Sequence, residues 1–141
     1  MEDLKKDGTC FVCGSQNPKG LHIRPQKWEK GSFFEFVAEK SFCGWNKYLH
    51  GGVISLLFDE LLGWTSRFLG YKALTARLEI RYRKVVPIGT KLLFRGELKR
   101  ERRGLLFIDT VALFEDGSVA AEGKGTMMVV GKEDPSPPKN N

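Results

Sequence analysis

The chain has 141 residues, of which 41% are hydrophobic and 28% charged, and its formal net charge is +6. This size suits one domain with one hydrophobic core, and the positive charge suits an anionic partner such as a nucleic acid, a lipid surface or a small molecule. The longest apolar stretch, 53–69, is interrupted by Asp59, Glu60 and Arg67, and the N-terminus lacks an apolar signal core, so we expect a cytoplasmic protein with no membrane span.

The first third of the chain predicts loops and one strand. Residues 1–9 are polar, and we expect them to be flexible, whereas 10–21 is a loop-like stretch rich in Gly, Asn and Pro. Aromatic and β-branched residues at alternating positions predict a strand over 32–40. A second loop is expected over 42–49.

One long helix is predicted from 51 to about 69. Apolar residues recur there at helical spacing and widen into a stripe around nearly the whole circumference. A helix of this kind should be wrapped by other structure, and Gly70 suits its C-terminal cap.

Four strands are predicted after the helix, over 74–86, 90–100, 105–114 and 118–130, with a hairpin turn at Glu115, Asp116 and Gly117. In the first of these strands, regular alternation puts Leu74, Ala76, Leu78 and Ile80 on the inward face and Thr75 on the polar face. Residues 131–141 contain three prolines and are expected to form a disordered tail.

This order of elements predicts an α+β domain over 10–130. One central helix would be wrapped by a curved, mostly antiparallel sheet of five or six strands, which is the layout of the hot-dog fold.

Three segments carry a family resemblance. They read HGGVISLLFDELLG at 50–63, TARLEIRYRKVVPIG at 75–89 and CFVCGSQNPKGL at 10–21. Together they resemble the hot-dog thioesterase superfamily, in its phenylacetate-degradation thioesterase-like branch. The resemblance implies a thioesterase that hydrolyses an acyl-CoA to a free acid and coenzyme A, with no cofactor beyond the coenzyme A of the substrate.

The resemblance also implies roles for four residues. The backbone N–H of Gly51, at the start of the helix, would hold the thioester carbonyl oxygen as an oxyanion donor. Asp59 would act as a general base on water or as a nucleophile. Thr75 would position the water or the carboxylate, and His50 would support the glycine turn or the carbonyl.

Helix geometry predicts where this site is completed. Gly51 and Asp59 are eight residues apart, which is about 12 Å along a helix axis at ~1.5 Å per residue. One thioester group cannot contact both within one chain, so we expect two antiparallel helices in a homodimer to share the site. The assembly would be a homodimer or a dimer of dimers, which is a homotetramer.

Other interpretations of the acidic residues stay open. Asp59 could instead have a structural role, as a hydrogen-bond partner of Ser55 or a cap, and Glu60 is a rival carboxylate. Thr75 reaches the site only through its place at the start of its strand, because alternation puts it on the polar face.

Weaker candidates complete the list of site residues. For substrate binding they are Asn46, Gly52, Arg81, Arg83 and Lys84. The three cations among them suit the phosphates of coenzyme A. Alternatively, these cations only form a solvated face of the sheet. For a metal they are Cys10, Cys13, His22 and Cys43, because Cys-x-x-Cys has zinc-ligand spacing. Small apolar thiols in a buried loop are the alternative, and we expect no metal in the catalytic site.

Rival functions differ in class. A non-catalytic acyl-CoA-binding or regulatory module would not need the carboxylate of Asp59. A hot-dog dehydratase would need a catalytic His beside an acidic residue, which neither histidine offers. Nucleic-acid binding is disfavoured because the one predicted helix is apolar.

Overall fold

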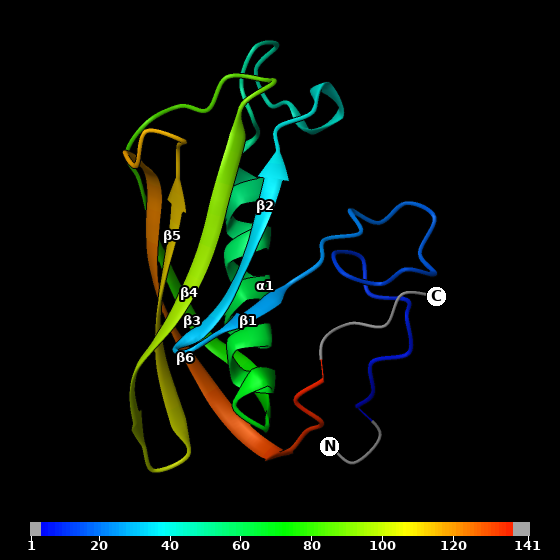
Figure 1. Cartoon of the computed structure of the whole chain (residues 1–141), viewed down its shortest axis with the longest axis vertical. Coiled ribbons are helices and arrows are strands. Elements are labelled where there is room, and N and C mark those ends of the chain that lie inside the picture. Colours follow the sequence, from blue (N-terminus) through cyan, green and yellow to red (C-terminus); the bar gives the residue numbers. More distant parts are fainter. Residues whose placement is uncertain (1–3, 137–141) are drawn as a thin grey trace.

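A computed structural model of the chain describes residues 4–136 and shows one long helix across a single six-stranded sheet (Figure 1). The helix is α1 (Gly51–Phe68), preceded by a short 3-10 helix, η1 (Lys40–Phe42). The strands are β1 (Gln26–Trp28), β2 (Gly31–Val37), β3 (Tyr71–Tyr82), β4 (Lys91–Arg102), β5 (Leu105–Leu113) and β6 (Val119–Lys132). The predicted α+β layout is therefore confirmed, with a six-stranded sheet.

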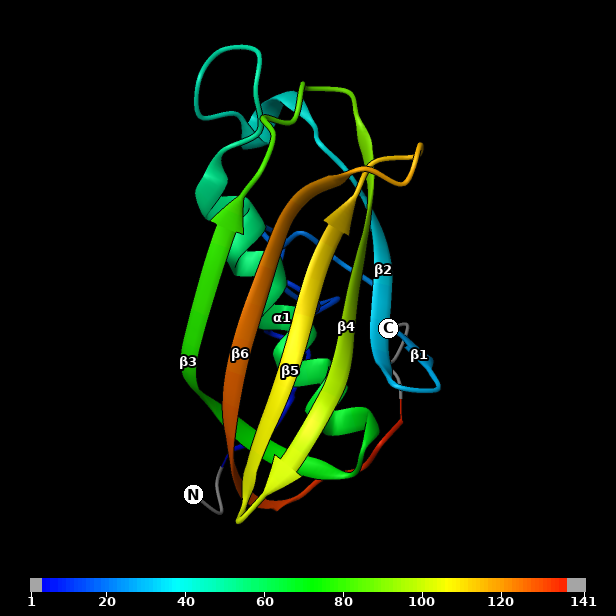
Figure 2. The same cartoon turned by 90° about the vertical axis from the view of Figure 1, so that its left-hand side faces the viewer.

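The sheet is antiparallel throughout. Its strands lie in the order β1-β2-β4-β5-β6-β3 (Figure 2), so β1 and β3 form its two edges. Tight hairpins join β4 to β5 and β5 to β6, and Arg103, Gly104 and Gly117 adopt positive φ in them. The predicted turn at 115–117 is confirmed. In the described part of the chain, no strand pairs with the outer side of β3.

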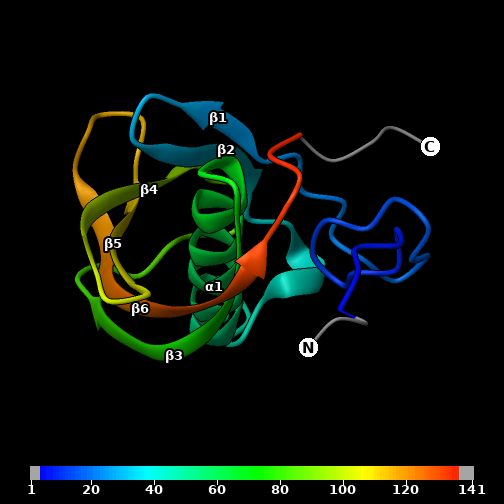
Figure 3. The same cartoon turned by 90° about the horizontal axis from the view of Figure 1, so that it is seen from below.

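The helix packs in the curve of the sheet, as Figure 3 shows. Leu57, Phe58 and Leu61 are fully buried, and the ring of Phe58 packs edge-on against that of Phe94 on β4, with 5.8 Å between centroids. Burial of each such side chain contributes about 1.5–3 kcal/mol to stability. This enclosure accounts for the wide apolar stripe in the sequence.

A second layer covers the side of α1 that faces away from the sheet. It consists of residues 4–24, called the N-terminal segment below, which Figures 1 and 3 draw in blue. Val12 and Ile23 are buried in the same core as the helix, and the Ile23 N–H donates to the Val12 carbonyl at 2.9 Å. Of the predicted flexible N-terminus, residues 1–3 lie outside the described residues.

The predicted alternation of β3 is wrong in its first half, because the strand contains a β-bulge. Thr75 pairs with Met127 and Arg77 pairs with Thr126, so Ala76 is the extra residue. An extra residue shifts the alternation of a strand, so the side chains before it lie on the face opposite to the one that regular alternation predicts. Leu74 and Ala76 therefore do not share the inward face with Leu78 and Ile80, whereas Thr75 faces the helix.

Several strand limits also differ from the prediction: β2 ends at Val37 rather than at 40, and β3 begins at Tyr71 rather than at 74. β3 ends at Tyr82 rather than at 86, because the N–H groups of Arg83 and Lys84 both donate to the carbonyl of Ala120. β6 continues to Lys132, past the predicted limit of 130, and Glu133 then donates its N–H to the Gly70 carbonyl. Residues 137–141 of the predicted tail lie outside the described residues. Within 4–136, no helix combines the length and the apolar character that crossing a membrane requires.

Candidate active site

The start of α1 is held by its own capping residue. His50 is the N-cap, and its Nδ1 accepts a hydrogen bond from the Gly52 N–H at 2.8 Å. The first N–H groups of a helix have no partner inside the helix, so a capping side chain satisfies one of them. Because Nδ1 accepts, a neutral His50 ring carries its proton on Nε2. The structure thus supports the interpretation that His50 stabilises the glycine turn.

A close approach explains the second of the two glycines that follow His50. A Cβ on Gly52 would lie 2.9 Å from Cε1 and Nδ1 of His50, inside the contact limit, so the cap requires glycine there. Gly51 is approached by Tyr82, whose hydroxyl donates to the Gly51 carbonyl at 2.9 Å. The end of β3 is thereby attached to the first turn of the helix.

The Gly51 N–H is free to bind a ligand. The N–H groups of its neighbours already have acceptors. The His50 N–H donates to the Phe42 carbonyl, the Gly52 N–H to the His50 ring and the Val53 N–H to the His50 carbonyl. None of the residues from 4 to 136 accepts a hydrogen bond from Gly51 N. A free N–H at the positive end of a helix dipole suits a developing negative charge on oxygen.

Two turns further along α1, Asp59 and Thr75 form a pair. The Thr75 hydroxyl donates to Asp59 Oδ1 at 2.6 Å, and this contact exists because the bulge at Ala76 turns Thr75 toward the helix. Asp59 lies on the exposed side of α1 in the single chain, although it falls within the apolar stretch 53–69. The fold thus brings Asp59 and Thr75 together, and their catalytic roles stay predictions.

The structure corrects one alternative for Asp59, its pairing with Ser55. Ser55 donates its hydroxyl to the Gly52 carbonyl at 2.9 Å, rather than to Asp59. The carboxylate that is buried is that of its neighbour, Glu60, which is 8% exposed. Burial, and the charge of Cys10 after it, raise the pKa of Glu60 to about 7. Glu60 therefore points away from the Asp59 side of the helix, into the N-terminal segment.

A cavity of about 490 Å³ lies beside the Asp59–Thr75 pair. Trp64, Leu74 and Met127 are among its apolar lining residues, and Lys6 and Arg67 are among its cations. The sequence patterns did not point to Lys6 or Arg67 as site residues. No short-range motif marks them, since they come from the N-terminal segment and from the last turns of α1.

The weaker substrate-binding candidates lie elsewhere. Arg83 pairs with Glu122, with Nη2 and Oε1 2.6 Å apart, and Arg81 lies on the outer face of the sheet, where it lines a different cavity. Lys84 is exposed just after β3, and Asn46 is exposed in the loop before α1, where its carbonyl accepts from Lys40. None of these four residues lines the cavity beside Asp59 in the single chain.

The metal-ligand set suggested by the sequence is corrected in part. Cys10 and Cys13 do lie together, but Glu60 joins them instead of His22 and Cys43. The His22 ring binds the Asn17 carbonyl through Nε2 at 2.7 Å, and Cys43 belongs to the segment between η1 and α1. Sequence spacing could not show this, because Glu60 is about fifty positions from the two cysteines.

Comparisons with known proteins agree on one family. The family model described as the thioesterase superfamily matches residues 46–121. Human acyl-coenzyme A thioesterase THEM5 is 24% identical over 127 residues, which cover 83% of this chain and 51% of that protein. The chain thus spans about half the length of the curated relatives it matches.

Solved structures share the fold. The protein smu.793 of Streptococcus mutans, bound to acetyl CoA, is 26% identical with a TM-score of 0.74, and the match covers 79% of this chain and 91% of that chain. The Escherichia coli PaaI protein of the phenylacetic acid degradation operon is 15% identical with a TM-score of 0.74, over 81% of this chain and 83% of that one.

A hypothetical thioesterase protein of Streptococcus pneumoniae is represented by two mutant structures. Both are 22% identical to this chain with a TM-score of 0.73, and each match covers 78% of this chain. The matches cover 92% of one mutant chain and 91% of the other. One carries an aspartate-to-alanine substitution and the other a threonine-to-alanine substitution, sixteen positions apart. The predicted hot-dog fold is confirmed by these similarities.

Proposed function

The chain belongs to the thioesterase superfamily, and we propose that it hydrolyses acyl-CoA thioesters at active sites that two copies of the chain share. In this reaction water adds to the thioester carbonyl carbon and the C–S bond breaks, which yields a carboxylic acid and the thiol of coenzyme A. A thiolate is a good leaving group, so the protein needs an activated oxygen nucleophile and an oxyanion donor more than a general acid.

The observation that carries the proposal is the hydrogen bond from Thr75 to Asp59 at the wall of the cavity. Thr75 holds one carboxylate oxygen, and no other group of residues 4–136 donates a hydrogen bond to Asp59. The second oxygen is then available to take a proton from water or to attack the carbonyl carbon. The two substituted positions of the Streptococcus pneumoniae protein have the same sixteen-residue separation as Asp59 and Thr75, which supports this pairing.

Gly51 supplies the oxyanion donor in this proposal. Its N–H has no acceptor within the described chain, and His50 and Tyr82 fix the backbone on either side of it. A donor that is already oriented before the reaction stabilises charge on the carbonyl oxygen without reorganisation.

Two observations support completion of the site by a second copy. Gly51 and Asp59 stand about 12 Å apart on one rigid helix, so one thioester cannot contact both. The long edge of β3 has an unpaired side within residues 4–136, and unpaired edges are natural pairing surfaces. Antiparallel pairing of two β3 edges would bring two α1 helices alongside each other in opposite directions.

The exposed face of α1 is shaped for such a neighbour. It presents Gly52, Ser55, Asp59 and Gly63, and a Cβ on Gly63 would meet nothing within 4 Å in the single chain. Small residues at helical spacing let a second helix approach closely. A homodimer is therefore the smallest active unit in this proposal, and a dimer of dimers is compatible with it.

The two ends of the substrate would meet different chemistry. Trp64, Leu74 and Met127 offer apolar walls for an acyl or aryl group beside Asp59. Tyr82 attaches the end of β3 to Gly51, and the cations that follow it in the sequence, Arg83 and Lys84, are this proposal's candidates for the phosphates of coenzyme A; Arg83 would exchange its pairing with Glu122 for the phosphate. Acetyl CoA bound to the Streptococcus mutans protein supports coenzyme A as the carrier.

The first test compares the wild type with Asp59→Asn on a panel of aryl-CoA and short- to long-chain acyl-CoA thioesters, with release of free thiol as the readout. Asparagine keeps the shape of the side chain and still accepts from Thr75, but it is neither a base nor an effective nucleophile. We expect the variant to lose at least about a hundredfold in kcat while its circular dichroism and oligomeric state stay unchanged.

Either of two outcomes would refute the proposal. Near-full activity of Asp59→Asn would remove Asp59 from the chemistry. Binding of acyl-CoA esters by the wild type without release of thiol from any of them would instead identify a non-catalytic acyl-CoA-binding protein.

A further inference from the structure

The Cys-x-x-Cys segment forms a tight turn that presents both thiols on one side. The Gly14 N–H donates to the Cys10 carbonyl at 2.9 Å, and a Cβ on Gly14 would lie 2.4 Å from Cys10 N. Only glycine fits there, so the backbone of the turn requires Gly14 directly after Cys13. We call residues 10–14 the cysteine turn.

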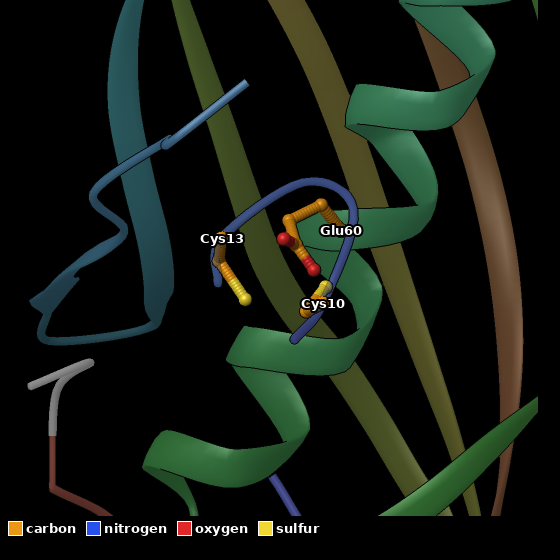
Figure 4. Close-up of side chains that lie close together, drawn as sticks. All are labelled: Cys10, Cys13 and Glu60. Atoms are coloured by element: carbon orange, nitrogen blue, oxygen red, sulfur yellow. The ribbon is translucent and has the colours of Figure 1, made fainter. Parts of the chain in front are cut away.

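The cysteine turn is packed directly against α1, and Glu60 enters it from the helix. Figure 4 shows the two sulfur atoms and the Glu60 carboxylate pointing toward one another. Cys10 Sγ, Cys13 Sγ and a carboxylate oxygen of Glu60 all lie within 4.8 Å of one another. These three groups come from two segments that are far apart in the sequence but adjacent in the fold.

One carboxylate oxygen of Glu60 has no hydrogen-bond partner among the residues the structure describes. Glu60 is 8% exposed, and this oxygen, Oε2, is buried. A buried carboxylate oxygen without a partner is strongly unfavourable, and such atoms in native proteins usually bind a donor or an ion. The oxygen lies at the cysteine turn, where a cation would satisfy it.

A cation lies beside the cysteine turn. Lys6 lies 4.0 Å from Cys13, between Nζ and Sγ. Its positive charge would stabilise a negatively charged ligand set.

We propose that Cys10, Cys13 and Glu60 bind one Zn²⁺ ion, with water in the fourth position. Two thiolates and one carboxylate are ligands that zinc accepts in tetrahedral sites, at about 2.3 Å for sulfur and 2.0–2.2 Å for oxygen. Atoms within 4.8 Å of one another can reach these distances by small side-chain rotations. The three anionic ligands and Zn²⁺ leave one negative charge, which the ammonium group of Lys6 offsets.

Zinc explains the site better than a disulfide between Cys10 and Cys13 does. A disulfide would join the two sulfurs but leave Glu60 Oε2 without a partner. The cysteine turn also does not open a helix, which is the usual setting of a redox-active Cys-x-x-Cys. Metal binding uses all three groups, and it displaces the protons of the two thiols.

The consequence of this site is structural. Zinc would link the N-terminal segment to the middle of α1. Its ligand Glu60 follows Asp59 in the sequence but lies on another side of the helix. Cys10 also borders the cavity beside Asp59, so the site would fix one wall of that cavity. This role does not depend on which thioester the protein hydrolyses.

The test measures metal content and ligand identity. Protein purified without chelators is analysed for zinc per chain by elemental analysis and by native mass spectrometry, and metal-free protein is titrated with Co²⁺. We expect one zinc per chain and a cobalt spectrum with the sulfur-to-metal charge-transfer band of thiolate ligands. Glu60→Gln, which preserves shape and removes the charge, should lower zinc affinity at least about tenfold.

Controls separate the site from the other cysteine. Cys10→Ser and Cys13→Ser should each abolish the charge-transfer band or reduce it, whereas Cys43→Ser should leave zinc content and spectrum unchanged. Two outcomes would overturn the proposal: wild-type protein that takes up neither zinc nor cobalt through sulfur, or a disulfide that consumes Cys10 and Cys13 in protein purified in air. Loss of metal in Cys43→Ser would also overturn it.

Discussion

At the scale of single residues, Thr75 shows how one hydroxyl can prepare a carboxylate for chemistry. Its hydrogen bond to Asp59 holds Oδ1, and its contact with Met127, 3.4 Å from Oγ1 to Sδ, keeps the hydroxyl at the edge of the core. A threonine here combines a donor with a methyl group that packs. In the proposed mechanism Thr75 is a positioning residue, since it acts through Asp59.

Substitutions at Thr75 test this role with matched side chains. Thr75→Val keeps the shape but removes the donor, and a hydrogen bond to a charged group is worth about 1.5–3 kcal/mol, so we expect kcat to fall about ten- to a hundredfold with little change in KM. Thr75→Ser keeps the donor and should retain most of the activity. Steady-state release of thiol measures both variants.

The paired design makes the outcome decisive. If Thr75→Val keeps its activity while Thr75→Ser loses it, the methyl group rather than the hydroxyl matters, and the positioning role is wrong.

At the scale of elements, the start of α1 is a unit made of His50, Gly51, Gly52 and the end of β3. His50 caps the helix through Gly52, where the absence of a Cβ leaves room for the His50 ring, and Tyr82 holds the Gly51 carbonyl. His50 and Gly52 are thus explained by capping and packing before any catalytic role is considered, whereas a Cβ on Gly51 would be in ordinary contact with the Tyr82 ring, at 3.4 Å.

A double-mutant cycle tests this explanation. Gly52→Ala should destabilise the protein by about 1 kcal/mol, because its Cβ would collide with the His50 ring and release a cap worth about 0.5–2 kcal/mol. In a His50→Ala background the collision is gone, and Gly52→Ala should be neutral or stabilising by up to about 1 kcal/mol, since alanine favours helix over glycine. Urea unfolding of the four proteins gives the coupling energy.

A coupling near zero would separate the two residues. It would show that Gly52 is present for another reason, such as close approach of a second helix.

At the scale of the whole molecule, the charge excess does not form one basic surface. On the outer face of the sheet, Glu97 pairs with Lys30 and Lys99, at 3.4 and 2.9 Å between nitrogen and oxygen, and Arg83 pairs with Glu122. The long helix packs its apolar sides against the sheet and the N-terminal segment, and its exposed face presents Gly52, Ser55, Asp59 and Gly63, none of which is a cation that could bind a phosphate. Both features continue to disfavour nucleic acid as a partner.

The shared active site leads to a complementation experiment. Gly51→Pro removes the proposed oxyanion N–H, and proline is tolerated at the first helical position. His50, with φ −63° and ψ 130°, already has the extended conformation that a residue before proline prefers. We expect Gly51→Pro and Asp59→Asn each to be nearly inactive as pure homodimers.

Mixing these two variants tests the dimer. A mixed dimer contains one site with both native groups, Gly51 from the Asp59→Asn chain and Asp59 from the Gly51→Pro chain. Random re-association at equal amounts should restore about a quarter of wild-type activity. The readout is thiol release after unfolding and refolding the variants together, with each variant refolded alone as the control. No recovery, despite mixed dimers seen by native mass spectrometry, would place the site within one chain.

Local sequence determined much of this fold, because its strongest signals are short in range. The apolar stripe of 51–69 and the turn at 115–117 predicted α1 and the last hairpin, since each follows from side-chain period or turn chemistry in one segment. The motif of residues 50–63 and the position of Thr75 pointed to the Asp59 site through the resemblance they carry. The short strand β1 gave no comparable signal in three residues.

Only the tertiary structure decided which side chains meet. A bulge depends on the register of β3 against β6, and neither strand's own pattern shows it, so alternation placed Thr75 on the wrong face. Burial depends on what covers a helix, so the buried carboxylate proved to be Glu60 rather than Asp59. Cys10 and Cys13 find Glu60 because the chain folds back across α1, a long-range contact that spacing along the sequence does not encode.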